Sequence, residues 1–198
     1  MKIPNRKVII GIVLAYILWY FVFLVDTLNS IWYRVTFASL ILTVYVNTDN
    51  ELPSFISLSE VVYGLGSGIL LYALFYIGFN LFRPLVAEGV FNVYLFRNEL
   101  PLIFPAILLI LTSFCEEYFW RGFTQKNLIE TYGKSGVLIT SILYASIHLP
   151  TFNFPLIMAA LLAGLAWGIL YEYTDSFWII VFSHIAWAEL IFVLLPLG

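Results

Sequence analysis

Residues 100–121 of the chain read LPLIFPAILLILTSFCEEYFWR, an apolar run that ends in two glutamates and an arginine. A helix over this run is long enough to cross most of the ~30 Å hydrocarbon core of a bilayer. Ionisable residues within a membrane segment are costly and therefore rare, so each is a functional candidate. The stretch predicts a membrane-spanning helix, approximately Leu100–Trp120, with a chemically important end.

The rest of the sequence has the same apolar character. Of its 198 residues, 62% are hydrophobic and only 11% are charged, whereas about a quarter of a soluble domain is usually charged. The expected surroundings are therefore membrane lipid. A net charge of −3 without a basic block gives no support for a nucleic-acid partner, and the single cysteine, Cys115, excludes an intrachain disulfide.

Six further apolar segments are expected to be helices, because a segment in lipid must satisfy its own backbone hydrogen bonds. They are approximately Val8–Val25, Ile31–Val46, Leu58–Phe82, Ser135–Leu149, Phe154–Tyr171 and Ser176–Leu197. The predicted fold class is an all-α polytopic transmembrane helix bundle of about seven spans. It forms a single domain over residues 1–198, with a motif-bearing core at about 100–197. The mixed stretch Arg83–Glu99, with Pro84 near its start, is expected to be an interfacial helix or a long loop.

The distribution of Lys and Arg predicts a cytoplasmic N-terminus and a C-terminus outside. With seven spans, the inner side holds Lys2, Arg6, Lys7, Arg121, Lys126 and Lys134. The outer side holds Arg83 and Arg97, while Arg34 lies within the second span near its outer end.

The two glutamates of the opening stretch are expected to play different parts. Glu117 and Arg121 are four residues apart and can pair on one helix face. Glu116 is rotated by ~100° from Glu117, so this pairing leaves its carboxylate available as a base. The alternative is a charge cluster that only anchors the helix end at the membrane interface.

Both histidines of the chain fall in apolar segments. Tyr144 precedes His148 by four residues, so its ring is expected to pack against the imidazole. His184 lies in the last segment. A lone membrane histidine usually forms a hydrogen bond between helices, but two histidines together with a double glutamate favour a shared site.

Small residues at four-residue spacing predict close helix packing around this site. Ala160, Gly164 and Gly168 share one face of the sixth segment, and Gly64 and Gly68 share one face of the third. Glu60 begins the third segment and is expected to be a capping or interfacial residue.

Taken together, these motifs resemble those of the CAAX prenyl protease type II family, also called the CPBP intramembrane glutamic endopeptidase or Abi family. The resemblance covers only the second half of the chain, through Glu116-Glu117-x-x-x-Arg121, Tyr144-x-x-x-His148 and the motif that starts at His184. It implies a peptidase that forms no covalent intermediate and uses no cofactor, and that cleaves a peptide or lipidated protein at the membrane. Glu116 and His148 would then activate a water, and His184 would stabilise the oxyanion.

The chain departs from the family pattern at two positions. Tyr144 stands where the family usually has Phe, and Ala188 stands where an Asn or Asp usually follows the last histidine by four residues. Either Glu189, Ser183 or another residue takes over from the missing amide, or the oxyanion site is incomplete.

Two other functions therefore remain open. A membrane scaffold or bacteriocin-immunity protein with the same fold would need no complete oxyanion site. A zinc-dependent protease could use one glutamate and two histidines as ligands, although no H-E-x-x-H motif is present.

The order of the segments also sets a geometric condition on the shared site. Simple alternation places His148 near the outer end of the fifth helix and Glu116 near the inner end of the fourth. A site that contains both requires a fifth helix that is short, tilted or stopped inside the membrane.

Overall fold

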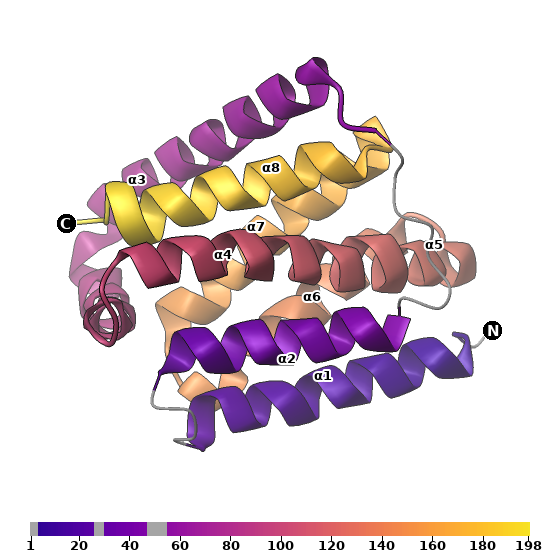
Figure 1. The fold of residues 1–198 in the computed structure, drawn as a ribbon, viewed down its shortest axis with the longest axis horizontal. Coiled ribbons are helices and arrows are strands. Elements are labelled where there is room, and N and C mark those ends of the chain that lie inside the picture. Colours follow the sequence, from indigo (N-terminus) through magenta and orange to yellow (C-terminus); the bar gives the residue numbers. More distant parts are fainter. Residues whose placement is uncertain (1–3, 26–29, 47–54) are drawn as a thin grey trace.

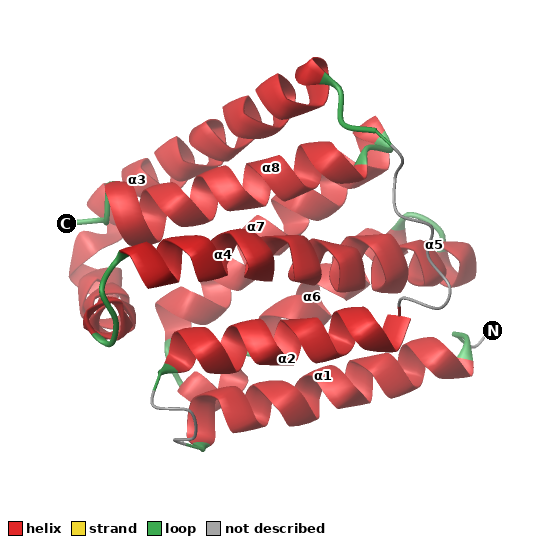
Figure 2. Cartoon of the chain, in the orientation of Figure 1, coloured by secondary structure: helices red, strands yellow, loops and turns green. Residues whose placement is uncertain are grey.

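The structure, a computed structural model, describes residues 4–25, 30–46 and 55–198, and in these ranges it contains helices and no strand (Figures 1 and 2). Lys2 and residues 26–29 and 47–54, which separate the first three predicted apolar segments, lie outside the described residues. The main helices are α1 Arg6–Leu24, α2 Ile31–Val46, α3 Leu58–Tyr94, α4 Ile103–Glu117, α5 Lys126–Tyr132, α6 Ser135–Ser146, α7 Phe154–Thr174 and α8 Phe177–Ala188. Two 3₁₀ turns, η1 Leu95–Asn98 and η3 Leu149–Thr151, and two π-helical segments, η2 Tyr118–Gln125 and η4 Glu189–Leu194, complete them.

The helices account for all seven predicted apolar segments. Five helical stretches in the described part of the chain are long and apolar enough to cross a membrane, and two shorter apolar ones, 31–46 and 135–151, accompany them. Figure 1 shows α1 and α8 starting at the same end of the bundle and the C-terminus at the opposite end. The predicted polytopic α-helical bundle is thus confirmed.

The fourth span is longer than the sequence indicated. α4, η2 and α5 form one continuous helical stretch from Ile103 to Tyr132, rather than a span that ends at Trp120. The π-helical turns of η2 keep the backbone hydrogen-bonded through the polar residues. Arg121 is fully buried, so it lies inside the bundle and not in a loop at the end of the span. Glu116 accordingly lies in the middle of this helix and not at its inner end.

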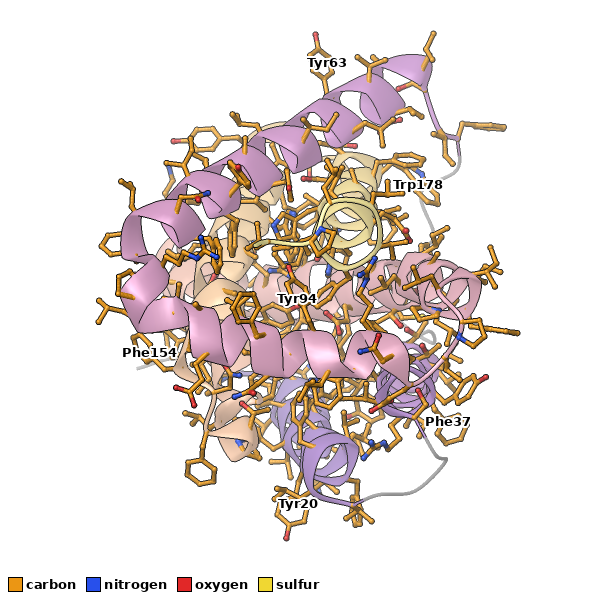
Figure 3. All side chains as sticks on the ribbon, turned by 90° about the vertical axis from the view of Figure 1, so that its left-hand side faces the viewer. Tyr20, Phe37, Tyr63, Tyr94, Phe154 and Trp178 are labelled. Atoms are coloured by element: carbon orange, nitrogen blue, oxygen red, sulfur yellow. The ribbon has the colours of Figure 1, made fainter. Side chains whose placement is uncertain are left out.

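α3 consists of two arms that meet at a kink, as Figure 3 shows. The backbone of Phe82 is non-helical (φ −109°, ψ 16°), two residues before Pro84. Proline lacks a backbone N–H and its ring clashes with the preceding turn, which explains the kink. Of the two alternatives for residues 83–99, the helix is therefore confirmed.

The second arm of α3 is bonded to the elements around it. Tyr94, which Figure 3 places between this arm and the C-terminal helix, donates from its hydroxyl to the Ile191 carbonyl at 2.9 Å. Trp32 Nε1 donates to the Phe96 carbonyl at 2.8 Å, and the Ile31 backbone N–H donates to Glu99 at 2.7 Å. These bonds connect the arm and η1 to α2 and η4 at one end of the bundle.

Two glycines let α3 approach α8 closely. A Cβ atom on Gly64 would lie 2.5 Å from Cβ of Phe182, and one on Gly68 would lie 2.4 Å from the Ser183 carbonyl oxygen. Any residue larger than glycine at either position would therefore force the two helix backbones apart. The predicted small-residue packing of this helix is therefore present.

Polar groups at two helix ends have local partners. Glu60 forms a capping box with Ser57 at the start of α3, as expected for a capping residue. Arg34 donates from Nη1 to the Val22 and Val25 carbonyls, both at 2.8 Å, at the end of α1. Carbonyls at a helix C-terminus lack partners within the helix, so a cation is stabilised there.

Candidate functional site

The ionisable residues of the predicted site are buried inside the bundle. Their exposed fractions are 6% for Glu116, 0% for Glu117, 0% for Arg121, 9% for His148 and 6% for His184. Buried charges are stable only when they are paired and hydrogen-bonded. Their partners therefore decide what each group can do.

Glu117 and Arg121 form the predicted ion pair. Arg121 Nη1 donates to Glu117 Oε1 at 3.0 Å, one helical turn away. Arg121 Nη2 donates to the Gly164 carbonyl of α7 at 3.1 Å, and the guanidinium lies over the rings of Tyr144 and Trp167, at 5.0 and 5.5 Å from their centroids. The cation is thereby fixed between three helices.

Glu117 has a second partner that the spacing could not reveal. His184 Nδ1 lies 2.8 Å from Glu117 Oε1, although the two residues are 67 positions apart. The imidazole also stacks on Trp167 with ring centroids 3.8 Å apart and an interplanar angle of 22°. A carboxylate can only accept, so Nδ1 carries a proton and the histidine presents Nε2 away from Glu117.

Glu116 faces a different group, as the ~100° rotation between neighbours on a helix requires. The Tyr144 hydroxyl donates to Glu116 Oε2 at 2.7 Å. The other carboxylate oxygen, Oε1, has no hydrogen-bond partner among the described residues. Glu116 is therefore held through one oxygen and keeps the other available.

His148 lies in the turn after α6, where its orientation is fixed from two sides. Nδ1 is 3.0 Å from the Tyr144 carbonyl, and the Tyr144 ring packs edge-on against the imidazole at 5.5 Å, as predicted. Phe23 of α1 contacts the ring from a further direction, at 5.7 Å between centroids. Because a carbonyl oxygen only accepts, Nδ1 donates and Nε2 carries the lone pair.

One cavity of about 150 Å³ brings the three predicted catalytic side chains together. Glu116, His148 and His184 all line it, whereas Glu117 and Arg121 do not. The remaining lining is mainly aromatic and aliphatic, from α1, α2, α4, α6, α7, α8, the second arm of α3, η1 and η4. The helical part of the fifth segment is indeed short, since α6 ends at Ser146. Together with the central position of Glu116, this satisfies the geometric condition set by the sequence.

Comparison with protein families gives one match over the region that holds these residues. Residues 98–189 match the family model described as "Type II CAAX prenyl endopeptidase Rce1-like". The chain is similar to that family over this region, which is slightly less than half of its length. No curated protein and no solved structure matches the chain. The motif-bearing core thus resembles that of a CAAX protease-like membrane endopeptidase, in a chain that has the helices of an integral membrane protein.

Within this Rce1-like region, Ala188 lies on the cavity and its two suggested substitutes do not. Ala188 lines the cavity on the same face of α8 as His184. Ser183 is not a lining residue, and its hydroxyl accepts from Trp167 Nε1 at 3.3 Å. Glu189 begins η4 and is not a lining residue either. Neither side chain occupies the position of the missing amide.

One feature of this site lay beyond sequence reasoning. The stacking of Trp167 on His184 has no signal in the sequence, because Trp167 belongs to a helix that is apolar on every side. No group of three or more His, Cys, Asp or Glu side chains close enough to hold a metal ion occurs in the described part of the chain. Glu116, His148 and His184 share the cavity but do not converge as a ligand set.

Proposed function

We propose that the chain is an intramembrane glutamate-type endopeptidase that hydrolyses a peptide bond in a membrane-associated peptide or lipidated protein. The observation that carries this proposal is the division of the two glutamates. Glu116 lines the same cavity as both histidines, while Glu117 does not line it and is bonded to Arg121 and His184.

Glu116 acts as the general base in this proposal. Its oxygen Oε1 takes a proton from a water molecule, and the water oxygen forms a bond to the substrate carbonyl carbon. The lone pair on His148 Nε2 accepts the second hydrogen of the same water, which fixes its orientation. The π electrons of the carbonyl move onto its oxygen, and the resulting tetrahedral intermediate carries a negative charge there. When this intermediate collapses, the carbonyl forms again, the C–N bond breaks, and the proton on Glu116 passes to the leaving amine.

His184 stabilises that charge through Nε2. Because Nδ1 already donates to Glu117, Nε2 can donate only when the ring carries both protons. The surrounding charges suit this state, since Arg121 and a protonated His184 balance the carboxylates of Glu116 and Glu117. A fixed donor in a water-poor site stabilises an oxyanion much more strongly than the same donor in water.

The surroundings of the cavity favour a membrane-embedded substrate over a soluble one. Most of the lining side chains are apolar, and the helices around them are exposed mainly through large hydrophobic residues. The expected partners are thus membrane lipid and the substrate chain. The predicted cytoplasmic N-terminus and outer C-terminus are part of the same proposal.

The alternative of a non-catalytic scaffold or immunity protein is favoured by one observation, the methyl group of Ala188 where the resemblance expects an amide. A zinc-dependent protease is the second alternative. Both predict results that differ from those of a glutamate peptidase.

The test is cleavage of a library of membrane peptides by the purified protein in bicelles. Glu116→Gln should abolish turnover, whereas Glu130→Gln, which changes an exposed glutamate of the same continuous helix, should retain it. Exhaustive chelation should leave turnover unchanged. Full activity of Glu116→Gln would refute the assignment of the base. Activity lost on chelation and restored by stoichiometric zinc would favour the zinc protease, and no cleavage by the unmodified protein would favour the scaffold.

A further inference from the structure

In the proposed reaction, a second hydrogen-bond donor beside His184 would stabilise the oxyanion further. Most of the polar side chains that line the cavity are committed elsewhere. Trp32 donates to a backbone carbonyl, Thr112 is bonded to another threonine, and Trp167 donates to a serine. Ser113 Oγ and Trp187 Nε1 have no partner in the described part of the chain, but packed neighbours enclose both atoms. None of these five donors is open to the cavity and free to act.

Tyr144 differs from these residues because its hydroxyl is bonded to the proposed base itself. The hydroxyl lies 2.7 Å from Glu116 Oε2, and Tyr144 lines the same cavity as His184 and Ala188. A hydroxyl carries one hydrogen that rotates about the C–O bond, so it can be given to either of two nearby acceptors. The two acceptors here are the Glu116 carboxylate and the carbonyl oxygen of a substrate.

The ring that carries this hydroxyl is held in place. It packs edge-on against Trp120 and His148, each at 5.5 Å between centroids, and the Arg121 guanidinium lies 5.0 Å from its centroid. A Cβ atom on Gly164 would lie 3.1 Å from Tyr144 Cδ1, so the glycine provides the space that the ring needs. The oxygen is thus preorganised, and only its hydrogen has to move.

We propose that Tyr144 is a catalytic residue whose hydroxyl becomes the second oxyanion donor, in the role that an amide at position 188 would have. This inference rests on the proposed function. Before the reaction, the hydroxyl donates to the ionised Glu116 carboxylate. When Glu116 takes a proton from water, its charge disappears and it becomes a weaker acceptor, while negative charge appears on the substrate oxygen. The hydrogen of Tyr144 then turns to the oxyanion and stays covalently bonded to its own oxygen throughout.

The decisive variant is Tyr144→Phe, which removes one hydroxyl and keeps the ring contacts. It should lower kcat by about 10²-fold, the typical loss on removal of one oxyanion donor, with KM changed by less than about threefold. Tyr16→Phe is the matched control, because it also removes a tyrosine hydroxyl bonded to a side chain, that of Ser146 at 2.5 Å, but outside the cavity. Its kcat should equal that of the unmodified protein.

The second variant adds an amide to the face of α8 that carries His184. In the Tyr144→Phe background, Ala188→Asn should restore kcat by at least about tenfold, because it supplies the lost donor again. In the unmodified background the same substitution should change kcat by less than about threefold. This rescue distinguishes oxyanion donation from a role of the hydroxyl in holding Glu116, which an amide on α8 cannot replace.

Three results would overturn the inference. A fully active Tyr144→Phe protein beside an inactive Glu116→Gln protein would refute the role of Tyr144 and leave the proposed function intact. A Tyr144→Phe protein that Ala188→Asn does not rescue would show that the hydroxyl only positions Glu116. An active Glu116→Gln protein, or an inactive unmodified protein, would refute the proposed function and this inference with it.

Discussion

Glu117 should matter more for stability than Glu116, although a change at either position is expected to reduce activity. Glu117 is fully buried and its Oε1 atom accepts both from Arg121 at 3.0 Å and from His184 at 2.8 Å. In Glu117→Gln the amide oxygen can still accept from His184, but the positive charge of Arg121 loses its counter-ion. Removing one partner of a buried ion pair typically costs about 3–5 kcal/mol, and we expect a loss of that size in the free energy of unfolding.

Glu116→Gln should behave in the opposite way. Its amide oxygen can still accept from the Tyr144 hydroxyl, and Arg121 and His184 both keep their bonds to Glu117. The free energy of unfolding should therefore fall by less than about 1 kcal/mol. Its turnover should nevertheless disappear. Glu130→Gln, which changes an exposed residue of α5, is the control. Its free energy of unfolding should stay within about 0.5 kcal/mol of that of the unmodified protein.

The measurement is reversible unfolding in mixed micelles with an increasing proportion of a denaturing detergent, followed by tryptophan fluorescence. The signal is the sum over six tryptophans. Trp167 contributes a site-specific part, because it stacks on His184 and its ring centroid lies 5.5 Å from the Arg121 guanidinium. In the Glu117→Gln protein, a further Arg121→Met substitution removes the unpaired cation. It should restore at least about 1 kcal/mol, since apolar replacements of buried pairs are often neutral or stabilising.

A Glu117→Gln protein that unfolds together with the unmodified protein would refute this reasoning. Greater destabilisation by Glu116→Gln than by Glu117→Gln would also refute it, because the two carboxylates would then have exchanged roles.

Two further predictions concern packing and topology. Gly68→Ala should lower the free energy of unfolding by about 1–3 kcal/mol, because its Cβ would lie 2.4 Å from the Ser183 carbonyl oxygen. Gly66→Ala meets nothing within 4 Å and should raise it by up to about 1 kcal/mol; equal effects in the two variants would contradict close α3–α8 packing. For topology, cysteines introduced singly by Lys134→Cys and Leu195→Cys should differ in reaction with a membrane-impermeant maleimide on intact cells. Labelling at 195 alone supports a cytoplasmic N-terminus, and labelling at 134 alone inverts the topology.

The helical segments and two contacts of the site could be predicted from local periodicity and hydropathy. The apolar segments were recognisable because each helix must be apolar to lie in lipid, and four of them, α2, α3, α6 and α7, begin where the sequence predicted. The Glu117–Arg121 pair and the packing of Tyr144 on His148 were also predictable. Both depend on four-residue spacing within one segment, and an α-helix places such residues next to each other.

The boundaries of the polar fourth helix were not predictable by the same reasoning. A double glutamate and an arginine at the end of an apolar run look like the end of a span, because charged side chains without partners are costly in lipid and usually lie outside it. In the folded protein their partners come from α7 and α8, through the Gly164 carbonyl and His184. The helix can therefore continue through them to Tyr132.

The amino-acid sequence by itself determined a helical membrane bundle and the side chains that carry its chemistry, because burial in lipid and helical spacing act on neighbouring residues. Only the tertiary structure decided which atoms of those side chains remain available. The bond from His184 to Glu117, the bond from Tyr144 to Glu116 and the stack of Trp167 on His184 each join separate helices. Such contacts depend on how the helices pack and rotate against each other, and no local pattern in the chain specifies that arrangement.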